Sequence, residues 1–183
     1  MCYNHHDSDP SFLGVHLILE IIKANLDEWA MLLENIKQVS KDVKLTAEDV
    51  AKLERYTDLT VSDQSTEEWY CLLRLTQGSF YHVLKAGYME NLGRWDGESG
   101  YVYVLDLDNK VFRAEGVGDD HDDDVVIIPL EKEELLKYAK EWSKGPLDES
   151  YDPEVALAKT LERKKMLSNL LKQAQGYDMV YNI

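Results

Sequence analysis

Turn-forming residues are scarce in this chain, and their scarcity limits the folds that it can adopt. The 183 residues include only 10 Gly and 4 Pro. An all-β sandwich or barrel needs a turn signal about every 8 to 12 residues, and so few Gly and Pro residues cannot supply them. Apolar residues make up 44% of the sequence, which is enough to offset the entropy of ordering the chain. We therefore expect a folded protein in which helices dominate.

Apolar periodicity predicts two long amphipathic helices. In residues 11–39 apolar side chains recur at spacings of three and four, as on one face of a helix. A second such helix is expected to begin at Asp152-Pro153, an N-cap followed by proline at the first helical position, and to end at Gly176. Packing the two helices against each other would bury both apolar stripes. A long helix of this kind also allows a homodimer.

Shorter helices are predicted between these two. Residues 46–49 read Thr-Ala-Glu-Asp, a capping box in which Asp replaces the usual Glu or Gln. Residues 65–68 form a regular capping box, although the following Trp-Tyr-Cys-Leu-Leu also suits a buried strand. We expect helix here, interrupted at Gly78 and continued as a short helix that ends at Gly93. The choice between helix and strand stays open for residues 65–93.

The strongest strand signals lie in the second half of the chain. Residues 101–105 and 111–114 are rich in β-branched and aromatic residues and are separated by a turn, which predicts a hairpin. Residues 125–128 predict a third strand, and a helix is expected over residues 131–142 before Gly145. The predicted fold class is therefore α+β, with two long amphipathic helices and shorter helices packed on a small antiparallel sheet.

The domain organisation is expected to be simple. Residues 1–10 are interpreted as a flexible N-terminus and residues 11–183 as a single α+β domain, with residues 144–151 as a candidate hinge. The N-terminus lacks the basic region of a secretory signal, and no apolar run approaches the roughly 20 residues of a membrane span. Only two cysteines occur, Cys2 and Cys71, which favours a reducing compartment. A cytoplasmic protein without membrane contact is expected.

Negative charge is the most distinctive property of the sequence. The chain has 35 acidic and 20 basic residues, a formal charge of −15, and residues 90–131 hold 12 acidic but only 3 basic residues. Such a surface repels phosphates and attracts basic protein grooves, so we expect a basic protein partner and no tight binding to free nucleic acid. The predicted partner-binding residues are Asp106, Asp108, Glu115, Asp119, Asp120, Asp122, Asp123 and Asp124.

Motifs for chemistry are weak. The aspartates of residues 116–124 suggest a divalent cation, but they lack the alternate spacing and the distal Glu of an EF-hand, so a solvated loop or a protein-binding patch fits better. Removal of Met1 would expose Cys2 as an N-terminal nucleophile, but no oxyanion loop accompanies it. The sequence contains no HExxH zinc motif, dinucleotide loop or nucleophile elbow. No catalytic residue, cofactor or metal site is predicted.

In size, charge and absence of catalytic motifs, the chain resembles the small acidic inhibitors that phages and mobile elements direct against nucleic-acid enzymes. These include anti-CRISPR proteins, particularly those against Cas9, and DNA-mimicking anti-restriction proteins. The resemblance is one of type, without a shared motif, and implies a non-enzymatic inhibitor that occupies the nucleic-acid-binding surface of a nuclease in the host cytoplasm. An immunity or antitoxin protein that neutralises a cationic nuclease toxin is the alternative. An enzyme that uses Cys2 or an aspartate-bound metal is the third.

Overall fold

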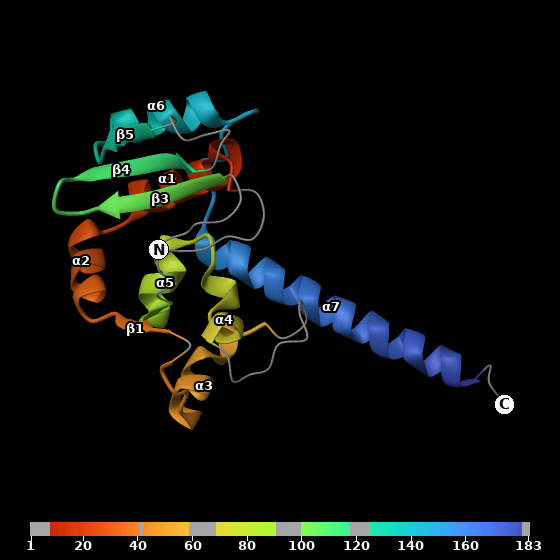
Figure 1. Cartoon of the computed structure of the whole chain (residues 1–183). Coiled ribbons are helices and arrows are strands. Elements are labelled where there is room, and N and C mark those ends of the chain that lie inside the picture. The colour runs from red at the N-terminus through yellow and green to blue at the C-terminus, as the bar shows by residue number, and fades with distance from the viewer. Residues whose placement is uncertain (1–7, 41, 59–68, 91–99, 118–124, 181–183) are drawn as a thin grey trace. The chain divides into compact units, whose positions relative to one another are not determined.

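The structure is a computed structural model that describes residues 8–40, 42–58, 69–90, 100–117 and 125–180 (Figure 1). The chain divides into two compact units, Met1–Glu149 and Ser150–Ile183. The first unit combines helices with a three-stranded antiparallel sheet, so the predicted α+β class is confirmed.

The antiparallel sheet consists of β3 (Gly100–Asp106), β4 (Val111–Val117) and β5 (Val125–Pro129), in that spatial order. The predicted hairpin and the predicted third strand are therefore confirmed. Alternate side chains point to opposite faces of the sheet. Tyr103, Phe112, Ala114 and Ile128 are buried on the inner face, at 8% exposure or less. The outer face carries the side chains that alternate with these.

Helices cover the inner face of the sheet (Figure 1). These helices are η1 (Pro10–Gly14), α1 (Val15–Lys23) and α6 (Lys132–Trp142), which contact one another, and α6 also contacts β5. The core between the helices and the sheet includes the fully buried side chains of Ile18 in α1, Phe112 in β4 and Leu135 in α6. A Cβ atom at Gly14 would lie 2.9 Å from the ring of Trp142, so the approach of η1 to α6 requires glycine.

The prediction of one helix over residues 11–39 is wrong. Three helical segments and a strand occupy this stretch, because α1 is followed by α2 (Leu26–Glu34) and β1 (Lys37–Val39). Ala24 is extended, with ψ of 146°, and the Asn25 side chain accepts a hydrogen bond from the Glu28 amide. An N-cap inside the run therefore ends one helix and begins the next. The apolar spacing continues across this break, so periodicity did not reveal it.

A second group of short elements completes the first unit. These are α3 (Ala47–Leu53), η2 (Glu54–Tyr56), α4 (Trp69–Leu72), η3 (Arg74–Thr76), α5 (Phe80–Ala86) and β2 (Tyr88–Glu90). The Thr46 capping box is present, which confirms the predicted start of α3. The helical interpretation of residues 65–93 is confirmed for α4 and α5.

The predicted helix end at Gly93 is wrong. Gly87 adopts a left-handed conformation, with φ of 75°, and ends α5. The next three residues form β2, which pairs in parallel with β1 in the register Lys37↔Tyr88. This pairing joins segments about fifty residues apart, which local sequence patterns cannot specify.

The second unit contains α7 (Pro153–Val180). The Asp152 side chain accepts a hydrogen bond from the Val155 amide, which confirms the predicted N-cap. The helix continues past Gly176, where the sequence predicted its end, because a single glycine within a helix costs only about 1 kcal/mol relative to alanine. Its predicted packing against the N-terminal helix stays a prediction.

The core predicts the cost of truncating Phe112. The variant Phe112→Ala should lower the free energy of unfolding by about 3 to 5 kcal/mol, because it leaves a cavity between the sheet and its helices. Ile127→Ala removes a side chain from the opposite face that is 55% exposed, and should cost less than about 1 kcal/mol. Urea denaturation followed by circular dichroism measures both. Equal losses would contradict this assignment of the two faces.

Candidate functional site

The structure describes only part of the predicted acidic surface. Asp106 is the last residue of β3, Asp108 lies in the turn that follows, and Glu115 lies in β4. The other predicted residues lie outside the described residues, namely Asp119, Asp120, Asp122, Asp123 and Asp124. Asp106 pairs with Val111, so Glu115 is four residues further along the hairpin, or about 13 Å. The hairpin brings Asp106 and Asp108 together but separates both from Glu115.

Asp106 shapes the hairpin turn. Its carboxylate accepts hydrogen bonds from the side-chain amide of Asn109 at 2.8 Å and from the Asn109 backbone amide at 2.9 Å. These bonds lower the pKa of Asp106. Lys110 then takes a left-handed conformation, with φ of 53°. The Asp106 carboxylate thus stabilises the turn, and the side chain of Asp108 is exposed within it.

Glu115 forms an ion pair on the outer face of the sheet. Its carboxylate lies 3.2 Å from the Arg113 guanidinium, and both side chains are about one third exposed. The register places Val104 and Val102 on one side of this pair and Ile127 and Val125 on the other. These last two are 55% and 56% exposed. The outer face therefore combines one ion pair with apolar rows, which the charge pattern alone did not indicate.

Negative charge belongs almost entirely to the first unit. Residues 1–149 contain 31 acidic and 15 basic residues, a formal charge of −16, whereas residues 150–183 have a formal charge of +1. Some carboxylates in the first unit are neutralised locally, as in the ion pairs Lys85–Glu28 and Lys137–Glu134. Such exposed pairs contribute at most about 1 kcal/mol each. The exposed charges of the first unit therefore affect the electrostatic potential of its surface more than they affect its stability.

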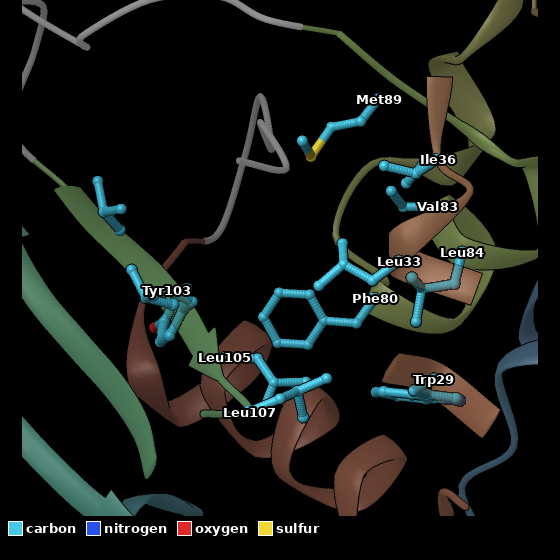
Figure 2. A pocket seen from close by; sticks show the side chains of 12 residues that line it. Trp29, Leu33, Ile36, Phe80, Val83, Leu84, Met89, Tyr103, Leu105 and Leu107 are labelled. Atoms are coloured by element: carbon cyan, nitrogen blue, oxygen red, sulfur yellow. The ribbon is translucent and has the colours of Figure 1, made fainter. Parts of the chain in front are cut away.

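An apolar cavity lies between β3 and the helices α2 and α5 (Figure 2). Its volume is about 230 Å³, and it has an open mouth. Trp29 and Leu33 of α2 line one side, and Phe80 of α5 projects between the helices and the strand. The remaining lining residues are Ile36, Val83, Leu84, Met89, Val102, Tyr103, Val104, Leu105 and Leu107. None of the lining residues that the structure describes is charged, and Leu33, which is 43% exposed, lies at the surface of the cavity.

Asp49 is the centre of a buried polar network. Its carboxylate accepts hydrogen bonds from the Tyr88 hydroxyl at 2.7 Å, from Thr46 and from the Lys37 ammonium at 3.2 Å. The bond from Tyr88 is the main reason why the pKa of Asp49 lies far below its usual range. Burial, together with the same bond, raises the pKa of Tyr88 to about 12. The network links α3 to the β1–β2 pair, so its role is structural.

A second buried carboxylate, Glu20, caps α5. The Ser79 hydroxyl donates to Glu20 at 2.7 Å, and the Tyr81 amide donates to the same carboxylate at 3.2 Å. Ser79 in turn accepts from the His82 amide at 3.1 Å. These residue types occur in hydrolytic triads, but here the serine proton is directed at the carboxylate and not at the imidazole. Ser79 and His82 are also at most 5% exposed, so a substrate cannot reach them.

The described part of the chain contains no metal-ligand cluster, and its one cysteine is buried. Within it, no three His, Cys, Asp or Glu side chains are grouped to hold a metal ion. Cys71 is 1% exposed, and its thiol is therefore inaccessible. Cys2 and His121 lie outside the described residues. The helices that the structure describes include none that is long and apolar enough to cross a membrane.

Comparisons with known proteins identify no relative. No family model, curated protein or solved structure matches this chain.

The Asp49 network predicts a dependence of stability on pH. Because its folded-state pKa lies below the unfolded value of about 4, the carboxylate stabilises the fold above that pH. The free energy of unfolding should fall as the pH decreases from about 5 to 2, and Asp49→Asn should be less stable at neutral pH and flatten this fall. Urea denaturation at several pH values measures it. Asp108→Asn, in the exposed turn, is the control, and an unchanged slope for Asp49→Asn would contradict the assignment.

Proposed function

We propose that this chain is a non-enzymatic inhibitor that binds the basic nucleic-acid-binding surface of a nuclease, as anti-CRISPR and anti-restriction proteins do. The observation that carries the proposal is the formal charge of −16 on residues 1–149. A solubility requirement alone would ask for a magnitude of about 2 to 8 in a small domain. The excess points to an electrostatic role.

The electrostatic argument also selects the class of partner. Nucleic-acid affinity depends on Lys and Arg side chains that neutralise phosphates and release counterions. A strongly acidic surface cannot do this, but it can occupy the basic groove that a nuclease presents to its substrate. Complementary charge would also accelerate the encounter between the two proteins. Occlusion of the groove then prevents the nuclease from binding its nucleic acid.

The described residues support a contact surface on the β3–β4 hairpin. Asp108 is exposed in the turn, two residues after Asp106. The five aspartates of residues 119–124 follow β4 in the sequence and increase the negative charge of this part of the chain. Exposed carboxylates of this kind mainly affect association rates, whereas desolvated ion pairs determine the lifetime of a complex.

Binding to a panel of basic proteins tests the partner class. The panel contains a Cas9–guide RNA complex, a restriction endonuclease, a cationic nuclease toxin and, as the control without a nucleic-acid groove, lysozyme. We expect binding to a nuclease but not to lysozyme or duplex DNA, with an affinity that falls as salt rises from about 0.05 to 0.5 M. Titration calorimetry and inhibition of DNA cleavage provide the readouts. Tight binding to DNA, or equal binding to lysozyme, would refute the proposal.

Neutralising the aspartates tests where the partner binds. The variant carries Asp→Asn substitutions at Asp119, Asp120, Asp122, Asp123 and Asp124. Its matched control carries Glu→Gln substitutions at the exposed residues Glu48, Glu54, Glu133, Glu141 and Glu149. Both remove five charges, but only the first should slow association with the nuclease by about tenfold and reduce the salt dependence. Surface plasmon resonance measures both rates. Equal effects would show that only net charge matters.

A further inference from the structure

We propose that the cavity beside β3 is the docking groove for an extended segment of a partner protein. The segment would add as a fourth strand to the edge of β3 that has no neighbouring strand among the described residues, and it would insert an apolar side chain into the cavity. This inference goes beyond the proposed function, because an electrostatic contact with a basic groove requires neither a strand edge nor an apolar cavity.

Hydrogen bonding within the sheet shows which backbone groups of β3 face away from β4. The Leu130 amide donates to the Lys110 carbonyl at 2.9 Å, on the β5 side of the hairpin. Backbone groups alternate sides along a strand, so Lys110, Phe112 and Ala114 bond toward β5. Val111, Arg113 and Glu115 bond toward β3. Their partners in β3 are residues 102, 104 and 106. The backbone groups of residues 101, 103 and 105 therefore point away from the sheet.

One of these three positions already has a partner. The Tyr101 amide donates to the Ser8 hydroxyl at 3.4 Å, which agrees with the outward direction derived from β4. Tyr103 and Leu105 follow at the same edge. In the described part of the chain, β3 is the first strand of its sheet and pairs only with β4. The amide and carbonyl groups of Tyr103 and Leu105 thus form an edge to which another strand can add.

The cavity adjoins this edge directly. Tyr103 and Leu105 both line it, and the apolar side chains of α2 and α5 form the facing wall (Figure 2). Its volume of about 230 Å³ exceeds the volume of roughly 150 Å³ that suffices for benzene in an apolar protein cavity. An aromatic or branched aliphatic side chain would therefore fit. The Tyr103 hydroxyl donates to the Ser8 carbonyl at 2.6 Å and offers no additional donor to a ligand.

An extended peptide satisfies both parts of this site. A small apolar molecule would fill the cavity but would cover the edge amides without bonding them, which costs free energy. A small polar molecule would meet few hydrogen-bonding side chains, since Trp29 and Tyr103 alone among the described lining residues carry an N–H or O–H group. In an added strand, backbone groups pair with Tyr103 and Leu105, while alternate side chains point toward the cavity.

Charge near the groove defines the chemistry at the ends of the segment. Glu34 follows Leu33 on α2, and Asp106 and Asp108 flank Leu107, another lining residue. Two cations, Lys37 and Lys85, also follow lining residues in sequence, but they pair with Asp49 and Glu28, so the balance of charge next to the lining remains negative. The partner segment should therefore have apolar residues at alternate positions and Lys or Arg at its ends.

Amide exchange with a defined peptide tests the added strand. The probe is the end-blocked peptide Lys-Val-Thr-Leu-Thr-Val-Lys, and its control has Ser at the three apolar positions. In the full chain without peptide, the Tyr103 and Leu105 amides should exchange rapidly, and the probe but not the control should slow them by about tenfold or more. Residues 102 and 104 should already be protected. NMR-detected hydrogen exchange resolves these positions individually.

Three outcomes would refute the inference. The first is no binding of the probe, and the second is binding that leaves both amides unprotected. The third is protection of Tyr103 and Leu105 in the peptide-free chain, because another segment of the chain or a second copy would then occupy the edge. Sedimentation velocity distinguishes these last two occupants.

Matched variants test each half of the site. Leu33→Asn alters the cavity surface, whereas Met31→Asn alters a side chain on the same helix that is 61% exposed and outside the lining. Only the first should weaken probe binding, by about tenfold. Leu105→Pro removes an outward amide without breaking a bond to β4, and Leu105→Ala removes only the side chain. Leu105→Pro should weaken binding more, and equal affinities within either pair would refute the inference.

Nuclease binding measured with the groove variants separates this inference from the proposed function. Leu33→Asn and Met31→Asn leave every carboxylate in place, and circular dichroism and urea denaturation verify that the variants fold. Nuclease binding that persists in Leu33→Asn while probe binding is lost would show two independent surfaces. Failure of the nuclease panel would leave the exchange result unaffected.

Discussion

Phe112 lies where the sheet and its covering helices meet, and the rest of the first unit depends on its packing. Its ring is fully buried, stacks on Tyr103 with 5.8 Å between centroids and meets Phe80 edge-on at 6.3 Å. These contacts join β4 to β3 and to α5. Phe80, which packs against Phe112, also lines the cavity beside β3. The core thus determines the position of the facing wall of the groove.

Carboxylates in this chain have two separate physical roles. Glu20 and Asp49 are buried and accept several hydrogen bonds, which compensate for the cost of removing them from water. The exposed carboxylates contribute little to stability but repel one another and attract basic partners. The net charge counts buried and exposed carboxylates alike, and it therefore overstates the acidic surface that a partner can contact. Asp106 illustrates this, since its side chain is occupied in forming the hairpin turn.

The sequence predicted the local elements better than their arrangement. The hairpin of residues 100–117 and the capped start of α3 follow from alternation and capping, which depend on neighbouring residues. The break at Asn25 was not predicted because the apolar spacing continues through it. The β1–β2 pair was not predicted because its two strands are distant in the sequence. The cavity combines α2, α5 and β3, so no single segment could indicate it. The Asp119–Asp124 part of the predicted surface stays a prediction.

The acidic hairpin and the apolar groove meet at the end of β3. Leu105 and Leu107 line the cavity, while Asp106 and Asp108 alternate with them along the chain. Salt screens the carboxylates over about 10 Å at 0.1 M, but it does not weaken backbone hydrogen bonds or apolar burial to the same degree. A partner that uses both surfaces would therefore associate through charge and remain bound through the groove. Asp108 is exposed and directly follows Leu107 of the lining, so one basic-ended segment would contact both surfaces at once.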